Sequence, residues 1–137
     1  MVAKTNQLVC RYWEILTDFT LSRFLTARNG NVELAAQLLL DHLEWRVSYK
    51  IDGILQEDFS DIASEKEFQW FGFDLTGHPC LLWRPSAHVA AADVGRNVRH
   101  FCYLLEKGLR EFSPAQTFTL VIDCRGASRK DLDWKAS

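Results

Sequence analysis

Residues 18–46 constrain the fold more than any other stretch, because they hold two helical patterns separated by a stop signal. In the first pattern, Leu21, Phe24 and Leu25 recur at intervals of three and four residues, which is the spacing of one face of an amphipathic helix. Gly30 then tolerates the left-handed backbone conformation that ends many helices. The stretch therefore predicts two helices joined by a tight turn.

The second helix of this predicted hairpin has its own start signal. Asn31 is suited to accept a hydrogen bond from a free amide of the first turn, and Glu33 places a carboxylate at the positive end of the helix. Its apolar stripe repeats with the helical period and consists of Ala35, Ala36, Leu39, Leu43 and Val47. A further helical pattern over residues 5–17 is expected to pack on the hairpin.

The composition describes a chain that can bury a core and that excludes several classes of function. The chain has 137 residues, of which 47% are hydrophobic, and this is enough for one ordinary domain. The formal charge is −2 with acidic and basic residues mixed, whereas a nucleic-acid-binding protein would need a clustered basic surface. No apolar run approaches the roughly 20 residues of a membrane span, and no signal-peptide pattern is present. We expect a cytoplasmic protein.

The cysteines and histidines give no sign of a metal site or of disulfides. The four cysteines are scattered without a C-x-x-C pair, and small buried side chains in a reducing compartment explain them better. The four histidines are not at metal-ligand spacing with them. We therefore expect no metal and no cofactor.

A change in composition divides the chain into two predicted parts. Residues 1–60 are expected to form a helical subdomain and residues 61–137 an α/β domain, with an ordered connector at the boundary. In the second part, aromatic and apolar runs flank a turn signal at residues 74–79, and this predicts two strands joined as a hairpin. A helix over about residues 87–112 and a strand over residues 117–123 complete a βαβ unit.

The last strand of this unit and the residues after it carry two further expectations. Its continuously apolar end is typical of a strand that is covered on both faces, as in a mixed or parallel α/β sheet. A final helix is predicted to begin after Ala127, with Ser128 as its cap. The predicted fold class is therefore mixed α/β, with an N-terminal helical hairpin and about three strands.

Three separated segments of the sequence resemble one family, the CRAL-TRIO domains. The first segment is Leu21-x-Arg23-Phe24-Leu25-x-Ala27-Arg28, followed by Val32-Glu33-x-Ala35 and by Leu43-Glu44-Trp45-Arg46. The second is Asp74-Leu75-Thr76-Gly77-His78-Pro79 followed by Leu81-Leu82-Trp83-Arg84, in which His78 stands where the family usually has arginine. The third is the strand that ends in Asp123-Cys124-Arg125-Gly126.

The resemblance spans roughly residues 15–134 and implies a function. CRAL-TRIO domains bind one hydrophobic molecule, such as a phospholipid, a phosphoinositide or a lipophilic vitamin, in a pocket with a sheet as its floor. A complete lipid-binding half continues for well over a hundred residues, so this chain is expected to be the N-terminal portion of a longer protein. As a truncated domain, it is expected to be unable to enclose a ligand alone.

The resemblance also points to the residues that would contact the lipid. Leu81, Trp83, Leu120 and Ile122 are candidates for the pocket floor, although packing against the predicted helix would explain each of them as well. In members that bind phosphatidylinositol, a basic pair after the tryptophan of the helical motif holds the phosphate. Arg46 matches the first of this pair, and Val47 replaces the second. We favour a structural salt bridge over a phosphate contact for Arg46.

Other functions have less support from the sequence. We expect no enzymatic activity, because the sequence lacks a nucleophile motif, a phosphate loop and a carboxylate pair. Asp123 at the end of a strand is explained by hydrogen bonds to the backbone amides that follow it. The alternative to lipid binding is a protein-interaction fragment that uses the helical hairpin or an exposed sheet edge. Peripheral association with membranes is also expected.

Overall fold

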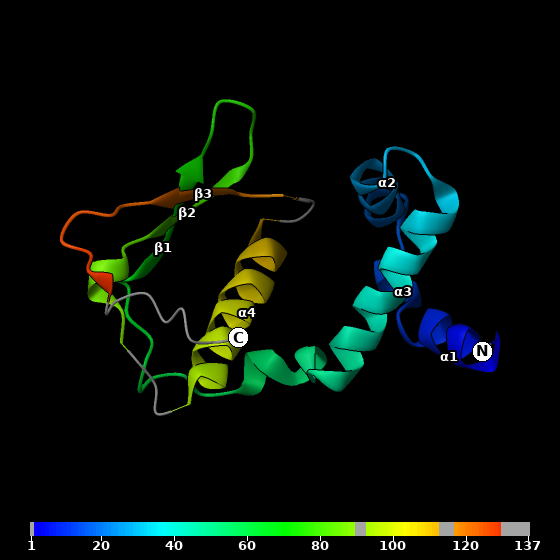
Figure 1. Ribbon diagram of the computed structural model, residues 1–137, viewed down its shortest axis with the longest axis horizontal. Coiled ribbons are helices and arrows are strands. Elements are labelled where there is room, and N and C mark those ends of the chain that lie inside the picture. The colour runs from blue at the N-terminus through cyan, green and yellow to red at the C-terminus, as the bar shows by residue number, and fades with distance from the viewer. Residues whose placement is uncertain (1, 90–92, 113–116, 130–137) are drawn as a thin grey trace. The chain divides into compact units, whose positions relative to one another are not determined.

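The structure is a computed structural model that describes residues 2–89, 93–112 and 117–129. The chain divides into two compact units, Met1–Gly53 and Ile54–Ser137. Figure 1 shows that the first unit is helical and that the second contains a sheet with a long helix. The division of the chain at residue 60 stays a prediction. The two compact units meet seven residues earlier, between Gly53 and Ile54, but this boundary does not test which residues fold as a domain. The predicted C-terminal helix lies mostly in residues 130–137, outside the described residues.

The first unit contains the predicted helical hairpin. Helix α1 runs over Val2–Arg11, α2 over Asp18–Ala27 and α3 over Val32–Ser48. The helix predicted over residues 5–17 ends earlier than expected, and a short 3-10 helix over Trp13–Ile15 follows it. Thr17 then caps α2, since its side chain accepts a hydrogen bond from the Thr20 amide.

The turn of the hairpin forms as its residues predict. Asn29 and Gly30 both adopt positive φ angles, of 53° and 80°, and the Gly30 amide donates to the Leu25 carbonyl at 2.8 Å. The side chain of Asn31 accepts a hydrogen bond from the Leu34 amide at 3.1 Å. The sequence thus sets both the end of α2 and the start of α3.

The core of the first unit lies between α1 and α3. Leu8, Tyr12 and Leu43 are buried there, and four partly buried side chains pack around them: Leu16, Leu39, Leu40 and Val47. Ala36, which the predicted stripe includes, is exposed. It lies about 100° around the helix from buried Ala35, so it falls outside the buried face.

The second unit contains a mixed sheet and confirms the predicted fold class. Strand β1 (Phe68–Phe73) pairs antiparallel with β2 (Pro79–Trp83), and β2 pairs parallel with β3 (Thr119–Ile122). In the part of the chain that the structure describes, the strand order is β1-β2-β3, so β3 lies at an edge. The register between β1 and β2 shifts between Trp70 and Phe73, where Gly72 has a φ of 50°.

Helix α4 (Val94–Glu111) connects β2 to β3 and packs on one face of the sheet. The indole of Trp70 lies directly on Gly108, and its Nε1 donates to the Leu104 carbonyl at 3.3 Å. The rings of Phe68 and Phe101 lie 5.6 Å apart. Helix α4 begins at Val94, later than predicted, after a short 3-10 helix over Pro85–Ala87.

His100 on α4 is buried in the second unit. The sequence pattern places this side chain on the exposed side of the helix, but it is only 4% exposed. Its ring packs between the rings of Phe59 and Phe68, at 5.4 and 6.2 Å. Burial lowers the pKa of His100, because the charged imidazole loses its hydration. Phe59 lies before the sheet in the chain, so its contact with His100 cannot be predicted from the apolar periodicity of α4.

Candidate functional site

The four candidate floor residues lie on one face of the sheet. In the parallel register, Leu81 lies beside Leu120 and Trp83 beside Ile122, and paired residues point to the same side. The antiparallel register places Phe68 beside Trp83. Since Phe68 contacts α4, all four candidates lie on the face that α4 partly covers.

The four candidates differ strongly in exposure. Leu81 is fully buried, and Trp83 stacks on Phe68 with nearly parallel rings 5.9 Å apart. By contrast, Leu120 is 41% exposed and Ile122 46% exposed. The inner pair therefore supports the sheet, while the outer pair leaves an apolar surface beside α4.

Strand β3 does not meet the expectation of cover on both faces. Val121 points away from α4 and is 40% exposed, as much as its neighbours on the other face. The apolar run is instead the edge strand of the described sheet, with one side paired to β2. Both faces of this strand and its outer edge are thus available for contacts.

A buried carboxylate, which sequence reasoning missed, orients Trp83. Glu67 is only 2% exposed, and its Oε1 accepts a hydrogen bond from the Trp83 indole at 3.4 Å. The same oxygen lies 2.7 Å from His88 Nδ1. In the sequence, Glu67 belongs to a charged stretch that resembles a solvated surface. Only the fold brings His88 and Trp83 to it and makes its burial tolerable.

The Asp74 motif is a rigid loop that links the hairpin to β3. Asp74 Oδ1 accepts hydrogen bonds from the amides of Thr76 and His78, both at 2.9 Å, and Oδ2 accepts one from the Thr119 hydroxyl at 2.7 Å. These bonds, that of Thr119 first, hold the pKa of Asp74 well below its usual range. His78, which stands at the family's arginine position, lies with Nδ1 2.7 Å from the Thr76 hydroxyl.

The Asp123 motif has the backbone role that the sequence predicts. Asp123 Oδ1 accepts a hydrogen bond from the Arg125 amide at 3.1 Å. The Arg125 guanidinium also binds both carboxylate oxygens, at 2.9 and 2.7 Å. These contacts lower the pKa of Asp123 to about 2. The motif therefore forms a local turn after β3, with Gly126 at a φ of 71°.

Arg46 lies in the helical unit and makes the expected salt bridge. Its side chain is 10% exposed, and its Nη2 lies 3.3 Å from Oδ1 of Asp52. Arg11 and the Tyr12 hydroxyl bind Oδ2 of the same carboxylate, at 3.2 and 2.8 Å. Burial alone would raise the pKa of Asp52, but the hydrogen bond from Tyr12 and the two arginines outweigh it and lower that pKa.

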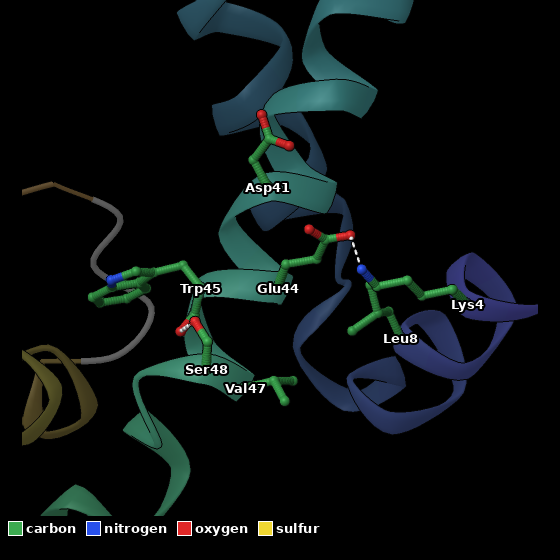
Figure 2. A pocket seen from close by; sticks show the side chains of 7 residues that line it. All are labelled: Lys4, Leu8, Asp41, Glu44, Trp45, Val47 and Ser48. Carbon is green, nitrogen blue, oxygen red and sulfur yellow. Dashed lines mark hydrogen bonds and ion pairs between the residues drawn. The ribbon is translucent and has the colours of Figure 1, made fainter. Parts of the chain in front are cut away.

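A surface depression of about 480 Å³ lies between α1 and α3 in the helical unit. It is lined by Lys4, Leu8, Asp41, Glu44, Trp45, Val47 and Ser48. Figure 2 shows an ion pair between Lys4 and Glu44, at 3.0 Å, and shows Trp45 projecting from α3 away from Lys4 and Leu8. Because its lining mixes charged and apolar side chains that point in different directions, the depression does not resemble an enclosed lipid pocket.

Arg96 and Arg99 on α4 both have acidic partners. Arg96 binds both carboxylate oxygens of Asp61, and its guanidinium lies 5.2 Å above the Phe59 ring. Arg99 binds Glu57 in the same two-point manner. These pairs fasten residues 57–61 to α4, so these two arginines stabilise the fold.

The described ranges contain neither a candidate metal site nor a candidate membrane span. Within residues 2–89, 93–112 and 117–129, no group of three or more His, Cys, Asp and Glu side chains could hold a metal ion. In the same residues, no helix is long and apolar enough to cross a membrane.

Comparison with known proteins identifies the relatives of this chain. Residues 64–136 match the family described as "CRAL/TRIO domain". The chain is 30% identical over 131 residues to "Protein real-time" of Aedes aegypti, with 85% of this chain covered. It is also 30% identical over 131 residues to "Phosphatidylinositol/phosphatidylcholine transfer protein SFH13" of Arabidopsis thaliana, with 82% covered. The chain spans about a fifth of the length of these two relatives, 20% and 21%.

Proposed function

The chain belongs to the CRAL/TRIO domain family, and we propose that it supplies part of the binding site for one hydrophobic lipid. The observation that carries this proposal is the apolar surface beside α4, where Leu120 and Ile122 are exposed next to buried Leu81. Burying a methylene group is favourable by about 0.8 kcal/mol, so such a surface favours an acyl or other hydrocarbon chain.

The face that carries Leu120 and Ile122 suits hydrocarbon better than the opposite face. Its other members are also apolar: Phe68, Trp70, Leu81 and Trp83. The opposite face carries the apolar side chains of Leu82 and Val121, but it also carries exposed Gln69 and half-buried Thr119, whose hydroxyl binds Asp74, so it is the more polar of the two. We therefore assign the acyl contact to Leu120 and Ile122, with Leu81 and Trp83 as the support beneath them.

The lipid class in this proposal is a glycerophospholipid. One relative is named for the transfer of phosphatidylinositol and phosphatidylcholine. A phosphate contact by Arg46 would require the arginine to exchange Asp52 for the headgroup, because Asp52 holds it in this structure. The proposal therefore rests on the acyl contact, and Arg46 is its secondary part.

Photo-crosslinking tests the proposal directly. The 137-residue chain would be incubated with a phosphatidylcholine that carries a photoreactive diazirine in its acyl chain, then irradiated, digested and analysed by mass spectrometry. We expect the label on peptides that contain β3, and we expect unlabelled phosphatidylcholine to compete. Because the diazirine also reports transient contact, the test does not require the chain to enclose the lipid.

Two variants of β3 serve as test and matched control. Ile122→Glu places a charge on the proposed face and should reduce labelling of β3 at least fivefold, because a carboxylate strongly disfavours contact with hydrocarbon. Val121→Glu places the same charge on the opposite face at a similarly exposed position, 40% against 46%, and should leave the labelling nearly unchanged. Equal loss in both variants, or label confined to the helical unit, would contradict the proposal.

A second function is favoured by the edge position of β3. Its outer edge offers backbone groups that could pair with a strand of another protein, beside apolar side chains on both faces. Under this alternative, light scattering would show a dimer or a partner complex that dissociates in both Val121→Glu and Ile122→Glu. Lipid binding instead requires a difference between the two variants.

A further inference from the structure

Among the described residues of the second unit, the tip of the β1–β2 hairpin carries the most exposed large apolar side chain, that of Leu75. Along β1 and the loop after it, the exposed fraction rises from 41% at Phe71 to 61% at Phe73 and 107% at Leu75. Figure 1 shows this loop rising beyond β3 at the top of the sheet. Leu75 therefore projects into solvent without packing against the rest of the unit.

Hydrogen bonds fix the conformation of the loop that carries Leu75. The Asp74 carboxylate binds two loop amides and the Thr76 hydroxyl, and it is tied to β3 through Thr119. Gly77 adopts a φ of 87°, which closes the turn. At the base of the loop, the Phe73 ring meets the Phe112 ring edge-on at 5.5 Å. Because the loop is already ordered, it would lose little conformational entropy when Leu75 enters an apolar environment.

The charge of the hairpin distinguishes between the partners that it could meet. In a chain with 25% charged residues, residues 68–83 contain no Lys, Arg or Glu and a single Asp, whose carboxylate is occupied by the hydrogen bonds above. Such a surface offers no ion pairs to a protein partner, whereas it can enter hydrocarbon without burying a free charge.

We propose that the β1–β2 hairpin inserts Leu75, with Phe73 behind it, into the surface of a lipid bilayer. This inference rests on the proposed lipid-binding function, because a protein that collects a lipid must meet the membrane that holds it. The contact is apolar rather than electrostatic, so it is insensitive to salt and to the charge of the lipid headgroups. Leu75 is the residue that sets the affinity.

Partition onto vesicles tests this inference in the 137-residue chain. Sedimentation with phosphatidylcholine vesicles, with and without phosphatidylserine, would give the partition coefficient at low and high salt. We expect Leu75→Ser to weaken partition about tenfold, since transfer of a leucine side chain into hydrocarbon is favourable by at least the 1.4 kcal/mol that a tenfold change represents. Leu75→Trp should strengthen partition, because tryptophan favours the bilayer interface.

The matched control is Val32→Ser, which removes an apolar side chain that is 70% exposed at the start of α3 and should not change partition. Unchanged circular dichroism would confirm that Leu75→Ser folds, as expected for a fully exposed side chain. The inference is overturned if the chain does not partition, if Leu75→Ser partitions as well as the wild type, or if binding requires phosphatidylserine and disappears in salt.

The two proposals can fail separately. If photo-crosslinking labels β3 while Leu75→Ser leaves partition unchanged, the bilayer contact is wrong and the lipid site stands. If partition depends on Leu75 but no lipid label reaches β3, the bilayer contact stands and the lipid site is wrong.

Discussion

Gly108 is predicted to be a position where alanine, normally the better helix former, destabilises the protein. A Cβ added at Gly108 would lie 2.2 Å from Cε2 of Trp70, far closer than carbon atoms approach in folded proteins. The indole would have to move away from α4. Its hydrogen bond to the Leu104 carbonyl would then be lost as well.

The expected magnitude follows from three opposing contributions. Replacement of glycine by alanine within a helix is favourable by up to about 1 kcal/mol. Forcing extra volume into a packed contact costs about 1–3 kcal/mol, and a lost hydrogen bond costs about 0.5–1.5 kcal/mol. Gly108→Ala should therefore lower the free energy of unfolding by about 1–3 kcal/mol, measured by urea denaturation followed by far-UV circular dichroism.

A double-mutant comparison separates the clash from any other effect of alanine. In a Trp70→Leu background the obstructing ring is absent, so Gly108→Ala should become neutral or stabilising by up to about 1 kcal/mol. This change of sign is the critical result. If Gly108→Ala stabilises the protein with Trp70 present, or destabilises it equally in both backgrounds, the packing of Trp70 on Gly108 is not what requires glycine.

Two further predictions concern the charged clusters. The folded-state pKa of Asp123, about 2, is below the ordinary value of an aspartate, so this carboxylate stabilises the protein above about pH 4 and its contribution disappears as the pH falls through 2. Asp123→Asn should therefore flatten that part of an acid-unfolding curve. An unchanged curve would refute the role of Arg125. Arg46→Met should lower the free energy of unfolding, measured by thermal denaturation, by about 1–3 kcal/mol, because it leaves the partly buried Asp52 with fewer partners. The double variant Arg46→Met, Asp52→Asn should recover part of this loss. A double variant less stable than Arg46→Met would show that the pair does not stabilise the fold.

Local chemistry explains why parts of this fold were predictable. The hairpin of α2 and α3 is specified by adjacent residues, since Gly30 ends one helix and Asn31 caps the next. The turn after Asp123 is equally local, because its carboxylate binds an amide two residues later. Such turns can be predicted from the sequence because their hydrogen bonds join residues only a few positions apart.

The shared face of the four candidate residues was predictable, but their exposure was not. The register of β2 and β3 does place Leu81, Trp83, Leu120 and Ile122 on one face, as alternation implies. Which of them are covered depends on where α4 crosses the sheet, and contacts such as that of Trp70 with Gly108 hold α4 there. The sequence holds no local record of a contact between residues so far apart.

The sequence by itself determined the helical hairpin and the strand and helix segments of the second unit, because periodicity, caps and turn residues act over a few neighbours, and three separated motifs carried the resemblance to the family. Only the tertiary structure decided that Glu67 is buried against Trp83 and His88, that His100 faces inward, and that Asp52 holds Arg46. Each of these depends on charges and rings brought together from distant segments. Their energies come from burial and pairing, which exist only once the chain has packed.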